Sequence, residues 1–165
     1  MENKTQIIAE TGKQELFIIR EFDAPRELVF KAFSEPDLII QWLGPCEMET
    51  VVEKLENKTH GSWRFIHKDP AGNAYAFNGV IHEVCYPERV IRTFEFEGLP
   101  ERGHVSLEFL TLEKLENDRT KATIQVIYKS MYDRDGHIQS GMERGVVDSH
   151  QRLDALFNLM KHESR

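Results

Sequence analysis

The sequence predicts an α+β protein, in which a curved antiparallel sheet of seven strands packs against one long C-terminal helix. Three observations support this fold class. Segments rich in β-branched and aromatic residues recur between turn-forming Gly, Pro, Asn and Asp residues. The connections between these segments are mostly short, so neighbouring strands are expected to pair antiparallel. Near the C-terminus the apolar period changes to steps of three and four residues, which is the period of a helix.

The composition is that of one globular domain. The chain has 165 residues, of which 40% are hydrophobic and 30% are charged. We expect a short leader at residues 1–14 and a single domain at residues 15–165. No apolar run approaches the roughly 20 residues of a membrane helix, and the N-terminus lacks the pattern of a signal peptide, so a cytoplasmic protein is expected. Cys46 and Cys85 are then most simply reduced thiols.

Net charge argues against a nucleic-acid partner. The formal charge is −7, and the Lys and Arg residues are scattered along the chain. Binding to phosphates usually needs a concentrated basic surface. We therefore expect neither nucleic-acid binding nor insertion into a membrane.

The first strand and two short helices are expected within residues 15–45. Residues 15–22 (ELFIIREF) have the composition of a strand. Asp23 can cap a helix, and Pro25 suits its first turn. Pro36 then ends this helix and opens a second one, which stops at Gly44.

Six further strands and the long helix complete the prediction. The strands are expected at residues 47–55, 62–68, 74–84, 89–97, 104–115 and 120–129. The helix is expected at residues 141–162, because one apolar stripe runs along it. The members of this stripe are Met142, Val146, Ser149, Leu153, Leu156 and Met160.

The N-terminal half of the long helix suggests a cavity. Gly141, Gly145 and Ser149 lie on or beside the apolar stripe, and each glycine inside a helix costs about 1 kcal/mol relative to alanine. Either the helix approaches the sheet closely or its small side chains leave space. Alternating aromatic residues on the strands favour an apolar pocket, with Trp42 as a lid. The same aromatics also fit a packed core, and the pattern alone does not separate the two interpretations.

No familiar catalytic or metal-binding motif is present. The sequence lacks HExxH, a Cys-His cluster, a GxSxG elbow, a Walker loop and GxGxxG, so no metal or cofactor is expected. His150 and Asp154 are four residues apart on the long helix, a spacing that can orient an imidazole. Such pairs are common on helix surfaces, and no partner nucleophile is evident.

Several short motifs together resemble a known family. They are REFDAP at 20–25, QWLGP at 41–45, GSWRF at 61–65, FNG at 77–79, PER at 87–89 and GMERG at 141–145. Their order and spacing resemble the homologues of the activator of heat-shock-protein-90 ATPase. These proteins have the helix-grip fold of the START and Bet v 1-like (SRPBCC) superfamily. The resemblance covers residues 16–160.

The resemblance implies a cavity between the long helix and the sheet, because many relatives bind lipids, sterols, polyketides or other hydrophobic molecules. Carried onto this chain, the cavity wall would consist of Trp42, Trp63, Phe65, Phe77, Phe94, Phe109, Met142, Val146 and Ser149. We therefore expect a binding module for a small hydrophobic or aromatic molecule. Ser149 or Tyr75 would orient this molecule.

Two other functions remain open. The family name suggests an activator of a chaperone ATPase, although the eukaryotic activators carry an additional N-terminal domain for chaperone contact. Some superfamily relatives are cyclases or hydrolases, which need an ionisable group inside the cavity. His67, Tyr75 and His82 are the candidates for that group, but a binding protein is favoured over an enzyme. A monomer and a homodimer both fit, because sheet edges in this fold can pair.

Overall fold

The computed structural model describes residues 3–163 as an eight-stranded antiparallel sheet and four helices. The strands are β1 (Gln6–Ile8), β2 (Glu15–Phe22), β3 (Glu49–Leu55), β4 (Ser62–Lys68), β5 (Ala74–Cys85), β6 (Arg89–Phe96), β7 (Val105–Leu115) and β8 (Arg119–Ile127). The helices are α1 (Arg26–Ser34), α2 (Pro36–Trp42), α3 (Met131–Gln139) and α4 (Met142–Glu163). The α+β class, the two short helices and the long C-terminal helix are thereby confirmed.

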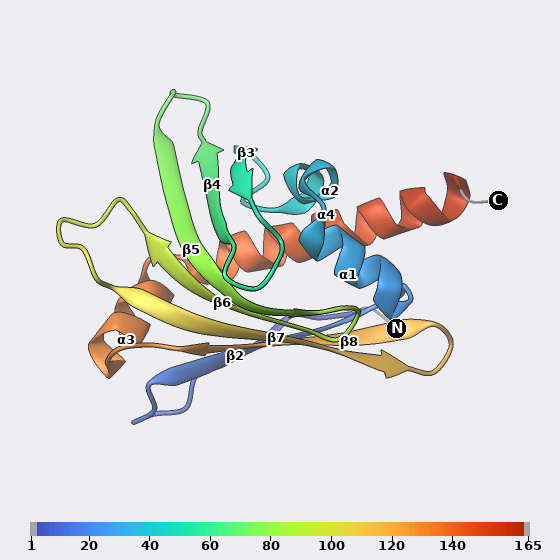
Figure 1. Cartoon of the computed structure of the whole chain (residues 1–165), viewed down its shortest axis with the longest axis horizontal. Helices are drawn as coiled ribbons and strands as arrows, with labels where there is room; N and C mark the ends of the chain where they lie inside the picture. The colour runs from blue at the N-terminus through green and yellow to red at the C-terminus, as the bar shows by residue number, and fades with distance from the viewer. Residues whose placement is uncertain (1–2, 164–165) are drawn as a thin grey trace.

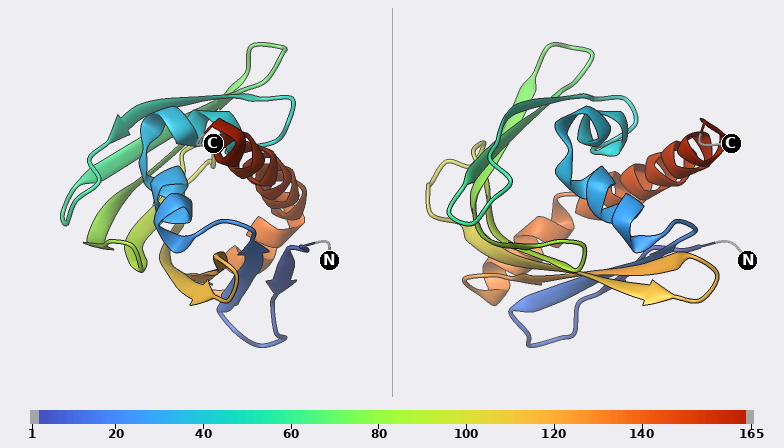
Figure 2. Two further views of the ribbon diagram at one scale, coloured as in Figure 1. Left: turned by 90° about the vertical axis from the view of Figure 1, so that its right-hand side faces the viewer. Right: turned by 45° about the vertical axis from the view of Figure 1, so that its right-hand side comes forward.

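The sheet curves around the helices (Figures 1 and 2). Its strand order is β1-β2-β8-β7-β6-β5-β4-β3, so β8, the last strand in the sequence, pairs with β2. Helices α1 and α2 carry the chain from β2 to β3, which forms the opposite edge of the sheet. Helix α4 runs across the concave face, with α3 near its start and α1 and α2 nearer its C-terminal half (Figure 1).

Strand alternation decides which side chains face α4. In β2 the buried positions are every second residue, beginning with Leu16 and Ile18. Paired residues of neighbouring strands point to the same face of the sheet. Leu16 lies opposite Val126 and Ile18 lies opposite Ile124, so these residues of β8 face α4 as well. The largest core cluster lies where α1, α2 and the C-terminal half of α4 meet the sheet. Its large members are Phe22, Phe30, Trp42, Leu110, Leu112, Leu153, Leu156 and Phe157.

The expectation of seven strands was wrong, because the predicted leader contains β1. This strand has three residues and pairs with β2, placing Ile7 opposite Ile18. Only Ile7 of β1 is half-buried, so the segment is too short to show a period of two.

Helix α3 was not predicted either. Its sequence, MYDRDGHIQ, is polar, and Arg134 is its one buried residue. Ser130 caps the helix, since its hydroxyl accepts a hydrogen bond from the Asp133 amide at 3.0 Å. Gly141 has a φ of +88° and lies between α3 and α4, so it turns the chain rather than lying within the long helix.

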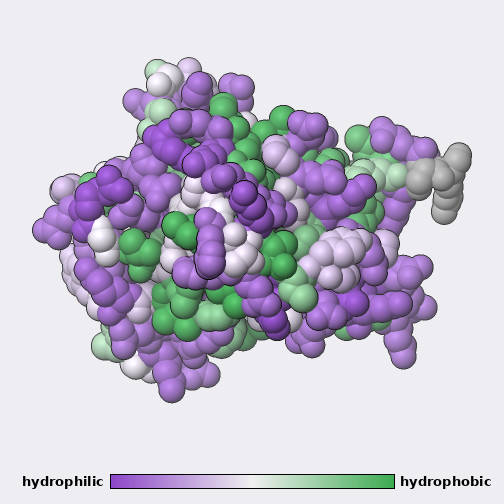
Figure 3. All heavy atoms as spheres, in the orientation of Figure 1, coloured by the Kyte–Doolittle hydropathy of each residue, from purple (hydrophilic) through white to green (hydrophobic). Residues whose placement is uncertain are grey.

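The outer surface combines polar and apolar atoms. The face in Figure 3 is mainly hydrophilic, with hydrophobic atoms gathered near its centre. Among residues 3–163, no helix is both long and apolar enough to cross a membrane.

Candidate functional site

A pocket of about 510 Å³ opens at the α3 end of the concave face. It lies between α3, the end of β6, the start of β7 and the loop that joins these two strands. The lining residues from the sheet and the loop are Phe94, Phe96, Leu99, Pro100, Glu101, His104, Val105, Ser106 and Tyr128. Those from α3 and its end are Tyr132, Asp133, Gly136, His137 and Ser140.

Aromatic rings from β6 form one wall of the pocket. Phe94 and Phe96 are two residues apart and therefore point to the same face. The Phe77 ring packs against both, with ring centroids 5.4 Å from Phe94 and 5.1 Å from Phe96. A Cβ on Gly98 would lie 2.3 Å from the Phe96 ring, so the loop backbone holds that ring in place. The wall is therefore closely packed and apolar.

Tyr128 and His137 form a polar pair beside this wall. The Tyr128 hydroxyl and His137 Nδ1 share a hydrogen bond, and the His137 ring stacks on Phe94 with centroids 6.0 Å apart. Burial lowers the pKa of His137 and, together with the charge of Glu108, raises the pKa of Tyr128. Both side chains are therefore neutral near pH 7. The hydrogen bond to Tyr128 uses His137 Nδ1, which leaves Nε2 on the other side of the ring for a further hydrogen bond.

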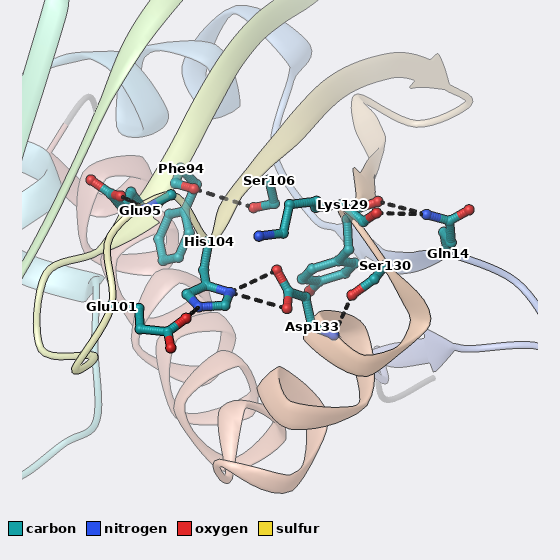
Figure 4. Close-up of polar contacts among 11 residues, drawn as sticks. Gln14, Phe94, Glu95, Glu101, His104, Ser106, Lys129, Ser130 and Asp133 are labelled. Atoms are coloured by element: carbon teal, nitrogen blue, oxygen red, sulfur yellow. Dashed lines mark hydrogen bonds and ion pairs between the residues drawn. The ribbon is translucent and has the colours of Figure 1, made fainter.

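A second polar group lies at the rim of the pocket (Figure 4). His104 Nδ1 is 3.0 Å and 3.1 Å from the two carboxylate oxygens of Asp133. On the other side of the ring, His104 Nε2 is 3.6 Å from a carboxylate oxygen of Glu101. The imidazole therefore joins the β6–β7 loop to α3 across the mouth of the pocket.

These groups can bind a molecule that is apolar along most of its length. Ser106 is 4% exposed, and its hydroxyl is a long 3.5 Å from the Phe94 carbonyl, so it retains capacity for another hydrogen bond. Together with His137 Nε2 it gives the pocket a few polar atoms among apolar walls, as is usual in small-molecule sites.

Most of the residues predicted for the cavity lie elsewhere. Phe94 lines the pocket, and Phe77 packs directly behind it. Trp63 and Phe65 are buried in a core cluster under β3 to β6, with ring centroids 4.7 Å apart. The Arg92 guanidinium lies over the Trp63 ring, 4.2 Å from its centroid. Trp63 and Phe65 therefore support the sheet rather than the pocket wall.

Two predicted residues join the helices to each other. Trp42 is 4% exposed, and its indole N–H donates to the Ala32 carbonyl at 2.9 Å, so it belongs to the core and not to a lid. The Ser149 hydroxyl accepts from the Gly44 amide at 2.8 Å and donates to the Gly145 carbonyl at 2.7 Å. It is thus used in holding α4 to the loop after α2.

The remaining predicted residues separate into three places. Met142 and Val146 pack against the cluster formed by β2 and β8. Phe109 lies between the inward-facing residues of β7 and so faces away from α4. Tyr75 is exposed near the β4–β5 turn.

His67 has a structural partner. Thr50 donates its hydroxyl proton to the Leu43 carbonyl at 2.6 Å, so the hydrogen bond of 2.8 Å between Thr50 and His67 is donated by His67 Nδ1. Burial, and then the charge of Arg152, lower the pKa of His67.

Sequence reasoning missed the polar groups of the pocket, among them His104, Tyr128, Asp133 and His137. Asp133 and His137 lie on α3, and Tyr128 directly follows β8. One signal was available: Ser130 and Asp133 have the spacing of Ser/Thr-x-x-Asp/Glu, which marks a helix start.

A second hollow, of about 440 Å³, lies between α4 and the segment before β1. It is more polar, and several of the groups in and beside it pair with one another. Arg20 is buried and pairs with Asp154 at 2.6 Å, while Thr5 bonds His150 Nδ1 at 2.7 Å. These contacts favour a structural role for the second hollow.

One group of side chains in the described residues has the spacing of metal ligands, namely Cys46, Glu47 and Asp148. The Arg144 guanidinium lies 2.8 Å from Glu47 and 3.9 Å from Asp148, so it already provides the positive charge there. The hydrogen bond to Glu47 raises the pKa of the Cys46 thiol, which disfavours the thiolate that metals bind.

Comparisons with known proteins agree with this fold. The family model described as "Activator of Hsp90 ATPase homolog 1-like protein" matches residues 23–158. A crystal structure of a protein from Rhodobacter sphaeroides aligns with a TM-score of 0.85 at 22% identity, covering 94% of this chain and 98% of that chain. A solution structure from Arthrobacter aurescens aligns with a TM-score of 0.83 at 22% identity, covering 93% and 91%. No curated relative matches the sequence.

Proposed function

The chain belongs to the family of Activator of Hsp90 ATPase homolog 1-like proteins, and we propose that it binds a small, largely apolar or aromatic molecule in the pocket beside α3. The observation that carries this proposal is the pocket itself. Its volume of about 510 Å³ is within the usual range for small-molecule sites, and Phe94, Phe96 and Tyr132 provide aromatic surface.

Burial of apolar surface would provide most of the affinity. At about 25 cal/mol per Å², burying about 200 Å² of a ligand contributes roughly 5 kcal/mol. The loss of translational and rotational freedom offsets part of this gain. A molecule with one or two rings is therefore expected to bind with a dissociation constant of about 0.2 mM or weaker.

Gly136 allows a direct test. It lies on the pocket wall within α3, and a Cβ built there meets nothing within 4 Å. Gly136→Trp should fill the pocket without straining the helix. Isothermal titration with 2-naphthol, a neutral two-ring probe, should detect binding to the wild type and none to Gly136→Trp.

Gly136→Ala is the matched control, because it changes the same backbone position without filling the space. It should bind 2-naphthol within about twofold of the wild type, and circular dichroism should show that both variants are folded. Unchanged binding by Gly136→Trp would place the site elsewhere. No binding of 2-naphthol or of other neutral aromatics to the wild type would remove the proposal.

A further inference from the structure

The pocket carries negative charge and lacks a basic side chain. Of the described residues that line it, none is Lys or Arg, whereas Glu101 and Asp133 are carboxylates. Sites for carboxylates and phosphates usually supply Arg or Lys as the counter-charge. An anionic ligand would therefore lose its hydration on binding and would be repelled by carboxylates of the same charge.

Lys129 lies beside Ser106 (Figure 4) but is not one of the residues that line the pocket, and two other basic side chains near the pocket are already engaged. Arg102, in the β6–β7 loop, donates to Glu95 at 2.7 Å. Arg134, on α3, donates to the Glu10 carbonyl at 2.6 Å and lies 3.1 Å from Asp135. To bind an anion in the pocket, either side chain would first have to give up these partners.

Protonation of histidine does not reverse the sign of the rim. His104 lies between Asp133 and Glu101 (Figure 4), so a protonated imidazole leaves this group of three at −1 and a neutral one leaves it at −2. Asp133 is the better placed carboxylate, because its side chain is only 10% exposed, whereas that of Glu101 is 82% exposed. A buried charge is screened less by solvent than an exposed one.

The aromatic walls, like the carboxylates of the rim, favour a cationic ligand. Phe94, Phe96 and Tyr132 line the pocket with aromatic rings, whose faces attract cations. Carboxylates at the rim and aromatic faces inside are the chemistry that recognises an organic cation with an apolar body. We propose that the pocket selects an amphiphilic amine, such as an arylalkylamine, over a carboxylate of the same skeleton; this inference rests on the proposed binding function.

Three indoles of matched size test the preference at pH 7.5. They are tryptamine, which is cationic, tryptophol, which is neutral, and indole-3-propionate, which is anionic. Isothermal titration should give tryptamine an affinity at least about tenfold above that of indole-3-propionate, with tryptophol between them. Gly136→Trp should abolish binding of all three.

Variants of the rim assign the preference to its carboxylates. Asp133→Asn should weaken tryptamine about tenfold, and the exposed Glu101→Gln about two- to fivefold, while tryptophol changes by less than about twofold. Glu116→Gln, in the β7–β8 turn at the other end of the sheet, makes the same change in net charge and should leave all three affinities unchanged.

The outcomes separate the inference from the function on which it rests. If tryptophol binds and Gly136→Trp blocks it, but indole-3-propionate binds as well as tryptamine, the pocket binds ligands and the preference for cations is wrong. If the preference persists in Glu101→Gln and in folded Asp133→Asn, the rim carboxylates do not cause it. If no indole binds the wild type, both proposals fail.

Discussion

At the α1 and α2 end of the concave face, Trp42 and Phe157 are almost fully buried, whereas at the α3 end Tyr132 is 84% exposed. Both ends have aromatic residues, so composition does not explain the difference. At the first end, the helices present large side chains to the sheet, and Phe33 and Trp42 pack with ring centroids 4.8 Å apart. At the second end, α3 presents Gly136, His137 and Ser140, which leave space. The opposing helix therefore decides whether an aromatic sheet face becomes core or pocket.

The largest expected effect comes from truncating the filled end. Trp42→Ala should lower the free energy of unfolding by about 3–5 kcal/mol, because it leaves a cavity and removes the hydrogen bond to Ala32. Tyr132→Ala, an aromatic truncation at the open end, should change it by less than about 0.5 kcal/mol. Urea unfolding of both variants measures this contrast. Equal losses would mean that the two ends are packed alike.

The same contrast explains what the sequence could predict. Long alternating strands and the apolar stripe of the C-terminal helix reflect burial, so β2, β4 and α4 were predicted within a residue or two. Periodicity also placed Trp63, Phe65 and Phe77 on one face correctly. It does not reveal whether the opposing element fills the space, and the predicted cavity residues therefore lie mostly in the core.

The pocket itself depends on the two parts of the chain with the weakest patterns. Helix α3 has no fully buried apolar residue, with only Ile138 partly buried against the core, and its start depends on the cap at Ser130. The loop between β6 and β7 is set by Gly98 against Phe96 and by the ion pair of Arg102 with Glu95. These contacts join residues that alternation does not relate, so His104 and Asp133 could not be paired from the sequence.

Two histidines with lowered pKa values, the buried His150 and the half-buried His137, give the second contrast through the dependence of stability on pH. Burial, and then the charge of Arg20, lower the pKa of His150 from 6.5 to about 3, whereas burial lowers that of His137 by less. As pH falls below 6.5, the unfolded chain gains a proton at His150 that the folded chain does not, so the free energy of unfolding falls. Between pH 7 and pH 5 this single group should cost about 2 kcal/mol.

Replacing each histidine by glutamine tests this expectation. His150→Gln, next to the filled end, should flatten the pH dependence between pH 7 and pH 5 more than His137→Gln does at the open end. His162→Gln is the control, since His162 is exposed near the end of α4. Urea unfolding at several pH values gives the slopes. A larger effect of His137→Gln would mean that the pocket end is the more tightly buried one.

The smallest expected effect concerns two glycines beside the pocket. They differ in backbone conformation but not in the space around them. A Cβ at Gly136 or at Gly141 meets nothing within 4 Å, but only Gly141 has a positive φ, of +88°. Gly136→Ala should therefore raise the free energy of unfolding by up to about 1 kcal/mol, since alanine favours the helix. Gly141→Ala should lower it by about 1 kcal/mol, because alanine is strained there. Thermal unfolding resolves this difference in sign. Destabilisation by Gly136→Ala would show that side chains already occupy the space facing α3, and the open end would then be packed like the filled one.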